Sequence, residues 1–231
     1  MGSLNRSAEM ARGSHASLPP ETRVEIWLKR RSGWRLAVKR LMDVVIVVLG
    51  APLASLAIGL AALAVKLDDG GQVFYRRRVV GPDGEFDAFK LRTMCADADH
   101  ILAANPGLRA EFEATYKLKN DPRVTRVGKY LRQWSLDELP QLWNVLRGQM
   151  SLVGPRMIVR REIEKFGPYG NIFQHVNPGL TGLWQVSGRQ EVSYQERVKM
   201  DVQYLEQWSL WLDVKILFKT AWKVLRREGA Y

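Results

Sequence analysis

Cysteine and histidine are scarce in this chain, which narrows the chemistry that it can perform. A single cysteine, Cys95, among 231 residues excludes an intramolecular disulfide and disfavours a zinc site built on cysteine. The three histidines, His15, His100 and His175, show no metal-ligand spacing. The sequence therefore indicates a reducing, cytoplasmic setting and gives no sign of a zinc centre.

Acidic residues are few in comparison with basic ones. The 35 lysines and arginines exceed the 24 aspartates and glutamates, which gives a formal net charge of +11. Such an excess favours a polyanionic partner: nucleic acid, an acidic membrane surface or a phosphorylated substrate. Because the sequence shows no helix-turn-helix, zinc-finger or base-stacking pattern, we expect no nucleic-acid partner.

Long hydrophobic runs are also missing, except for residues 41–65, in which only Asp43 is charged. These residues, at about 1.5 Å each, would reach about 37 Å, enough to cross a hydrocarbon core of roughly 30 Å. Pro52 lies near the middle, where its ring removes an amide donor and collides with the carbonyl of Val48. A kink is therefore expected at this proline.

Basic residues flank the apolar run on both sides, whereas a spanning helix keeps its basic excess on the cytoplasmic side. They are Lys29, Arg30, Arg31, Arg35, Lys39 and Arg40 before the run, and Lys66, Arg76, Arg77 and Arg78 after it. This symmetry favours a re-entrant hairpin that enters and leaves through one leaflet, with Pro52 at the kink. A kinked spanning helix and a buried helix of a soluble core are the alternatives.

Two further segments have the composition of helices that lie on an anionic membrane. Residues 22–39 combine apolar and tryptophan side chains with a dense basic set. Residues 208–227 place Lys215, Lys219 and Lys223 at four-residue spacing among aromatic and aliphatic side chains. For this second segment, packing on the domain core is the alternative, since such faces occur in both settings.

The rest of the chain predicts a small mixed domain. Short apolar runs at 72–75 and 86–91, separated by Gly-Pro-Asp-Gly, indicate a β-hairpin. Residues 97–117, interrupted by a Pro-Gly pair, and residues 139–146 have helical patterns. The glycine-rich segment 178–189 is more typical of a turn and strand.

The predicted fold class is α+β and mainly helical. It comprises a re-entrant membrane helix hairpin and a small cytoplasmic domain with a β-hairpin and interfacial amphipathic helices. The expected divisions are 1–20 as a flexible segment, 21–40 as an interfacial helix, 41–66 as the re-entrant helix and 67–231 as the catalytic domain at the cytoplasmic face.

Adjacent carboxylates, Asp137 and Glu138, lie between Arg132 and Arg156 in the sequence. Ser135-Leu136-Asp137-Glu138 fits a capping box, in which Ser135 accepts from the amide of residue 138 and Glu138 reaches back. Asp137 is in any case expected at a helix start, where amides and the dipole favour a carboxylate or an incoming phosphate. Helix capping and catalysis are both compatible with this pair.

Several ordered blocks between Lys39 and Tyr231 carry a family resemblance. The blocks are Lys39-Arg40-Leu41-Met42-Asp43, Lys90-Leu91-Arg92-Thr93-Met94, Asp121-Pro122-Arg123-Val124-Thr125-Arg126-Val127-Gly128, and residues 135–141, 150–156 and 178–188. They resemble the bacterial sugar transferases that start glycan assembly, the monotopic polyprenyl-phosphate phosphoglycosyl transferases. Residues 184–189 and 225–231 further resemble the branch that transfers galactose-1-phosphate.

The resemblance implies transfer of a hexose-1-phosphate from a UDP-sugar to undecaprenyl phosphate, with Mg²⁺, at the start of exopolysaccharide or O-antigen assembly. Asp137 then maps onto the nucleophile that carries a covalent phosphosugar, and Glu138 helps to hold Mg²⁺ or guides protons. The guanidinium groups of Arg132 and Arg156 are the expected phosphate ligands. Lys90 and Arg92 are weaker candidates, for which a solvated strand edge is the alternative.

The resemblance places the protein at the cytoplasmic face of the bacterial inner membrane, in contact with its lipid. Galactose is the first expected sugar, followed by glucose and N-acetylated hexosamines, and a homo-oligomer is left open. Met157 stands where the family usually has proline after Pro155-Arg156, and Ala51 stands before Pro52 where some members have serine. A membrane-anchored adaptor without activity is the alternative from another class, because a lipid anchor and basic amphipathic helices suffice for it.

Overall fold

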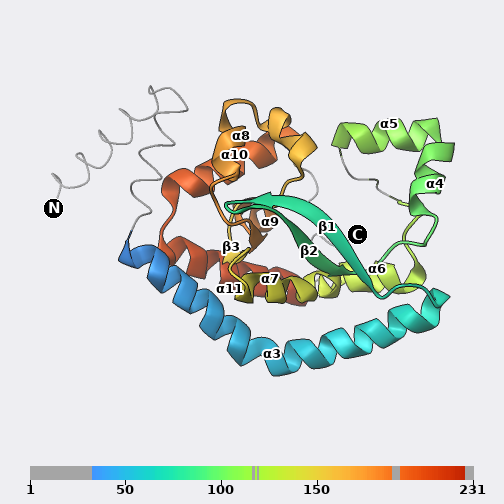
Figure 1. Cartoon of the computed structure of the whole chain (residues 1–231), viewed down its shortest axis with the longest axis horizontal. Coiled ribbons are helices and arrows are strands. Elements are labelled where there is room, and N and C mark those ends of the chain that lie inside the picture. The colour runs from blue at the N-terminus through green and yellow to red at the C-terminus, as the bar shows by residue number, and fades with distance from the viewer. Residues whose placement is uncertain (1–32, 116–117, 119, 189–192, 227–231) are drawn as a thin grey trace.

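The computed structural model describes residues 33–115, 118, 120–188 and 193–226, and within them the chain is mostly helical with a small β component (Figure 1). The predicted flexible segment 1–20 and most of the predicted interfacial helix 21–40 lie outside the described residues. The part of that segment from Trp34 onward belongs to the long helix described next.

One apolar helix, α3 (Trp34–Asp69), runs for 36 residues and is long and apolar enough to cross a membrane. It contains Pro52 and bends near its middle in Figure 1, as the sequence predicts. The helix ends at Gly70, which adopts a left-handed conformation with φ 71° and donates its amide to the carbonyl of Lys66. It is therefore longer at both ends than the apolar run itself.

The predicted hairpin is confirmed as an antiparallel pair, β1 (Phe74–Gly81) and β2 (Gly84–Leu91). The first strand extends further than the apolar pattern indicates, because Arg76, Arg77 and Arg78 continue it. These three arginines therefore belong to a paired strand and do not directly continue the apolar helix. They alternate between the two faces of the hairpin.

Helices and a short parallel strand pair complete the domain. The elements are α4 (Ala98–Ala104), α5 (Pro106–Thr115), α6 (Arg126–Gln133), η1 (Leu136–Gln141), α7 (Leu142–Leu146), β3 (Ser151–Val153), η2 (Arg160–Tyr169), α8 (Gly170–Phe173), β4 (Gly179–Thr181), α9 (Leu183–Gly188), α10 (Tyr194–Gln207) and α11 (Leu210–Arg226). The break before Pro106 is where the sequence predicts it. β3 pairs with β4 in parallel.

The prediction of a turn and strand over 178–189 is correct only for its first part. β4 ends at Thr181, and the chain then turns into α9, with the amide of Val186 donating to the carbonyl of Gly182. A Cβ on Gly182 would lie 2.3 Å from the carbonyl oxygen of Gly154. These glycines therefore mark a close approach of two backbone segments, not a continuing strand.

The core of the domain gathers apolar side chains from the hairpin, β3, α7, α10 and α11. A smaller cluster forms where the C-terminal half of α3, through Ala61 and Val65, packs against Leu91 and Leu131. The N-terminal half of α3 reaches the main cluster through Val47. Both halves of α3 therefore pack on the same domain.

The C-terminal helix α11 packs one side on the core and exposes the other. Asp213 and Ile216 are buried, whereas Trp211, Phe218 and Trp222 are exposed. The two alternatives for this segment, core packing and an interfacial face, are therefore compatible with each other.

A buried polar network ties the start of α3 to the domain. The ammonium of Lys39 donates to Asp213 Oδ2 at 2.6 Å and to the carbonyl of Val153 at 2.8 Å. The hydroxyl of Tyr204 donates to Asp213 Oδ1 at 2.7 Å. One turn further along α3, Asp43 accepts from the hydroxyl of Ser151 at 2.7 Å. Lys39 is thus an internal anchor and not part of a basic membrane flank.

Arg40 also binds groups within the protein. Its guanidinium donates to the carbonyls of Val145 and Leu146 at the end of α7, the second at 2.7 Å. The carbonyl of Val145 also accepts from the amide of Gly148, so the arginine adds to the C-terminal capping of α7.

We predict that Lys39→Ala lowers the free energy of unfolding by about 3–5 kcal/mol, because it leaves the fully buried Asp213 without its cation. Unfolding in detergent, followed by circular dichroism, measures the change. Arg35→Ala, at an exposed position on the same helix, is the matched control and is expected to change stability by less than about 0.5 kcal/mol. Equal stability of the two variants would contradict the anchoring role.

Candidate functional site

The two predicted carboxylates begin a short 3-10 helix, η1, beside the second strand of the hairpin. Ser135, immediately before it, has φ 54°, a left-handed conformation that costs energy for a residue with a side chain. Its side chain makes no capping hydrogen bond, so the predicted capping box between Ser135 and Glu138 is not formed. The tight turn aims Asp137 inward instead, where it is 8% exposed.

Lys90, on β2, is the cation closest to the pair. Its ammonium lies 2.6 Å from Glu138 Oε1 and 3.9 Å from Asp137 Oδ2. The strand is held in place by Asn144, which accepts from the amide of Phe89 and donates to the carbonyl of Asp87. The structure therefore brings Lys90 together with both carboxylates.

Burial dominates the electrostatics of Asp137. Loss of solvent raises the pKa of this carboxyl to about 6, while Lys90 and Arg132 act in the opposite direction and Glu138 adds to the rise. Arg132, on α6, donates its Nε to Thr93 Oγ1 at 2.9 Å, and burial lowers its pKa against the attraction of Asp137. Asp137 is thus a carboxylate held in a poorly solvated place by two cations.

Two of the predicted phosphate ligands have other partners. Arg92 forms an ion pair with Asp69 at the end of α3 and donates to the carbonyl of Gln72. Arg156 lies 3.5 Å from Glu162. The structure thus groups Lys90 and Arg132 with Asp137 and Glu138, which we call the dyad. Arg92 instead secures α3 to the hairpin, and Arg156 belongs to a neighbouring cluster.

The sequence analysis did not identify Glu162, the acidic residue at the centre of that neighbouring cluster. Glu162, on η2, is fully buried and lies 3.7 Å from Arg77 and 3.5 Å from Arg156. A signal existed for Arg77, because two-residue alternation along paired strands puts it on the same face as Lys90. No sequence pattern pointed to Glu162.

The dyad fits the donor set that Mg²⁺ uses with phosphorylated substrates, namely one or two carboxylates together with phosphate oxygens. Among the described residues, no third acidic or histidine side chain joins Asp137 and Glu138 to make a metal site of protein groups alone. Lys90 already neutralises part of their charge. A metal would therefore be shared with a bound diphosphate.

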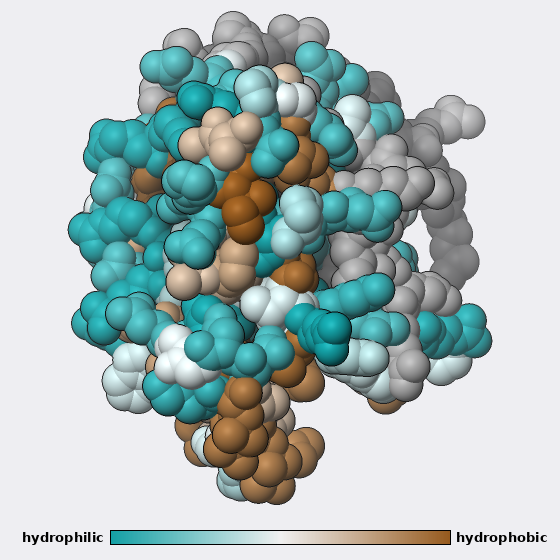
Figure 2. All heavy atoms as spheres, turned by 90° about the vertical axis from the view of Figure 1, so that its right-hand side faces the viewer, coloured by the Kyte–Doolittle hydropathy of each residue, from teal (hydrophilic) through white to brown (hydrophobic). Residues whose placement is uncertain are grey.

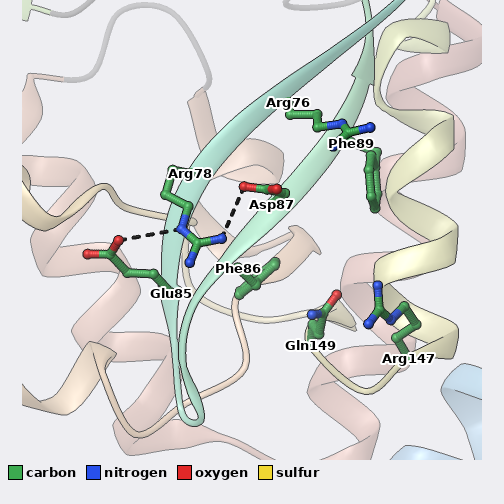
Figure 3. A pocket seen from close by; sticks show the side chains of 8 residues that line it. All are labelled: Arg76, Arg78, Glu85, Phe86, Asp87, Phe89, Arg147 and Gln149. Atoms are coloured by element: carbon green, nitrogen blue, oxygen red, sulfur yellow. Dashed lines mark hydrogen bonds and ion pairs between the residues drawn. The ribbon is translucent and has the colours of Figure 1, made fainter.

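A pocket of about 320 Å³ opens beside the hairpin, away from the dyad (Figure 3). Its lining residues are Arg76, Arg78, Glu85, Phe86, Asp87, Phe89, Arg147 and Gln149. Arg78 lies 3.5 Å from Glu85 and 3.3 Å from Asp87, so much of the pocket's charge is paired within it. Neither Asp137 nor Glu138 lines this pocket.

An apolar helix packed on a basic domain, with a buried carboxylate beside a lysine and an arginine, defines a membrane-associated protein suited to phosphate chemistry. The family model for bacterial sugar transferases matches residues 34–227. The chain belongs to the bacterial sugar transferase family.

Three relatives are closely similar in sequence. A UDP-galactose-lipid carrier transferase of Erwinia amylovora is 50% identical over 168 residues, 71% of this chain and 35% of that protein. An undecaprenyl-phosphate galactose phosphotransferase of Salmonella typhimurium is 51% identical over 168 residues, with the same shares. The exopolysaccharide production protein ExoY of Rhizobium meliloti is 49% identical over 172 residues, 72% of this chain and 76% of that protein. The matched part of this chain spans about a third of the length of the first two relatives.

We predict that Lys90→Gln raises the pKa of Asp137 above its value of about 6, because the ammonium favours the ionised carboxylate. A carbon NMR titration of labelled aspartate, with the signal assigned from Asp137→Asn, measures the midpoint. Lys129→Gln, at an exposed position on α6, is the control and should leave it unchanged. A midpoint at or below the wild-type value in Lys90→Gln would contradict the pairing.

Proposed function

We propose that this protein transfers a hexose-1-phosphate, with galactose as the first candidate, from a UDP-sugar to undecaprenyl phosphate and releases UMP. Membership of the bacterial sugar transferase family supports this reaction, and the names of the relatives support the acceptor and the sugar. The observation that carries the proposal is the buried Asp137, flanked by Lys90 and Arg132.

Asp137 is the nucleophile of the first half-reaction. A pKa of about 6 leaves its carboxylate largely ionised at neutral pH, so no base is needed to activate it. An oxygen of Asp137 bonds to the sugar-bearing phosphorus, and the bond from that phosphorus to the oxygen bridging to UMP breaks. UMP leaves with the bonding electrons, and the aspartate carries an acyl phosphate.

In the second half-reaction, a phosphate oxygen of undecaprenyl phosphate bonds to the same phosphorus. The acyl phosphate bond breaks and Asp137 recovers its carboxylate, while the sugar-linked phosphorus becomes part of the lipid diphosphate. Both half-reactions use one carboxylate in one place. The soluble donor and the lipid acceptor therefore need not be bound together.

Lys90 and Arg132 lower the charge that the carboxylate would otherwise present to an anionic donor. Their positive charges also stabilise negative charge that develops on the phosphoryl oxygens in the transition state. Glu138 holds the ammonium of Lys90 at 2.6 Å and so fixes its position. Asp137 and Glu138 together would hold Mg²⁺ against the diphosphate, where the metal would neutralise phosphate oxygens.

A re-entrant arrangement of α3 is part of this proposal. At about 1.5 Å per residue, its 36 residues would measure about 54 Å, well beyond a hydrocarbon core of roughly 30 Å. Both halves of the helix pack on the same domain, which a helix crossing the bilayer could do only if that domain entered the membrane. The exposed leucines near the bend, Leu49, Leu53 and Leu56, suit lipid contact.

Figure 2 supports the same orientation. Hydrophobic atoms gather on the projection at the bottom of the molecule, where α3 lies in Figure 1, and much of the surface above it is hydrophilic. In this orientation the bend of α3 dips into one leaflet. η1, which carries the dyad, contacts α3, so the dyad would lie near the boundary where a polyprenyl phosphate keeps its phosphate.

We predict that Asp137→Asn abolishes both UMP release and the covalent hexose phosphate on the protein, because the amide is not a competent nucleophile. A panel of UDP-sugars, assayed by UMP release and by mass spectrometry of the intact protein, measures both and identifies the sugar. Asp83→Asn, in the exposed hairpin turn, is the control and should retain both. A hexose phosphate adduct on the Asp137→Asn protein would refute the assignment, and wild-type protein without any UMP release would favour a non-enzymatic adaptor.

We also predict that both ends of α3 lie on the cytoplasmic side. In a Cys95→Ser background, the single variants Arg35→Cys and Asp68→Cys place a thiol at exposed positions near either end of the helix. Neither thiol should react with a membrane-impermeant reagent in sealed cells, and both should react after permeabilisation. Labelling of only one of them from outside would mean that the helix spans.

A further inference from the structure

Arg77 lies on the hairpin face that carries Lys90. The register pairs Tyr75 with Lys90 and Arg77 with Ala88, and cross-strand partners in an antiparallel pair point to the same face. Two residues along a strand correspond to about 6.6 Å. Arg76 and Arg78 point to the other face and line the pocket of Figure 3.

Glu162 couples Arg77 to Arg156. Its carboxylate is fully buried, and one oxygen accepts from the amide of Val159 at 3.0 Å, which fixes its direction. The guanidiniums of Arg77 and Arg156 approach it at 3.7 Å and 3.5 Å, long distances for a charged pair. Two guanidinium charges against one carboxylate leave one net positive charge in this cluster.

The surroundings of Arg156 preserve that positive charge. A further carboxyl beside Arg156 is that of Asp201, which is fully buried and accepts from the backbone amide of Arg156 at 3.2 Å. Burial raises the pKa of Asp201 to about 7, so it brings only part of a negative charge at neutral pH. The rings of Trp184 and Tyr194 each lie 6.0 Å from the guanidinium of Arg156 and restrict its position.

Arg77 itself is positioned to receive a ligand. Its side chain is 31% exposed, whereas that of Glu162 is inaccessible, so the open side of the pair is the arginine. Burial lowers the pKa of Arg77, and the neighbouring charge of Arg156 lowers it further. An anion placed beside these two guanidiniums would relieve this repulsion.

We propose that Arg77 and Arg156, spaced by Glu162, form a second anion subsite one strand step from the dyad, which binds the nucleotide-side phosphate of the donor. This inference rests on the proposed function. The sugar-bearing phosphorus lies against Asp137, and the adjoining phosphate, which leaves as part of UMP, lies against Arg77. Glu162 is a positioning residue that keeps both guanidiniums aimed at this phosphate.

The subsite serves only one of the two half-reactions. The donor and the departing UMP contain the nucleotide-side phosphate, whereas the acyl phosphate on Asp137 lacks it. Loss of Arg77 should therefore weaken donor and UMP binding and leave attack by undecaprenyl phosphate on a preformed adduct unchanged.

The test compares Arg77→Gln with Arg78→Gln, which removes the next arginine of the same strand on the opposite face. We expect Arg77→Gln to raise the donor KM and the inhibition constant of UMP by about tenfold to a hundredfold, the range for losing one charged hydrogen-bonding partner. Inhibition by uridine, which lacks the phosphate, should not change. Arg77→Lys keeps the charge and should recover part of the loss.

Several outcomes would overturn the subsite. Equal donor KM in the two glutamine variants would do so, and so would weaker inhibition by uridine and UMP alike in Arg77→Gln. A loss of second-step rate in single-turnover experiments with preloaded protein would also contradict it. Circular dichroism and thermal unfolding check that each variant is folded. Wild-type protein that releases no UMP from any donor would instead refute the proposed function, so the two failures are distinguishable.

Discussion

The structure depends on a buried ion pair between a membrane-seeking helix and the domain that it serves. Lys39 lies just before the apolar run of α3 and donates to the buried Asp213 and to the carbonyl of Val153. The hydroxyl of Tyr204 donates to the other carboxylate oxygen of Asp213. An apolar helix gains little by packing on protein when lipid is available, because both environments are apolar. A charge that is costly to leave unpaired can fix the depth and rotation of such a helix more strictly than apolar contacts do. This anchor, together with the ion pair of Arg92 with Asp69 at the other end, fixes α3 against the domain that carries the dyad.

At the dyad, in contrast, the attraction of nearby cations does not fully offset the cost of burying a charge. Burial works against the charge of Asp137, and the adjacent Glu138 adds to this penalty. Lys90 and Arg132 compensate for only part of it, so the carboxylate remains less stable than one in water. Ser135, two residues earlier, has a left-handed backbone conformation, which is a further local cost. The packing of the surrounding domain, including the hydrogen bonds of Asn144 at the edge of β2, sustains both costs.

Local patterns in the sequence were sufficient for the bend at Pro52, for the break before Pro106 and for the hairpin, whereas they left Lys90 as a weaker candidate beside the carboxylates. They failed where a residue's partner comes from a distant element. Ser135 fits a capping box by spacing, but the turn that brings Asp137 inward takes its place. Arg156 follows the dyad in the sequence, but in the structure it pairs with Glu162 on η2. The strand after Pro178 ends early because glycine contacts between residues 154 and 182 permit a sharp turn into α9.

The three consecutive arginines on β1 have different partners because strand pairing puts them on different faces of the hairpin. As a run, Arg76-Arg77-Arg78 is typical of a basic flank beside a membrane segment. Once β2 pairs with them, alternation separates the run into two on the face of the pocket and one on the face of the dyad. Arg78 is then neutralised by Glu85 and Asp87, while Arg77 shares a buried carboxylate with Arg156. Pairing with β2 thereby divides a uniform basic segment into arginines with different partners, and of the three only Arg77 shares the hairpin face of Lys90.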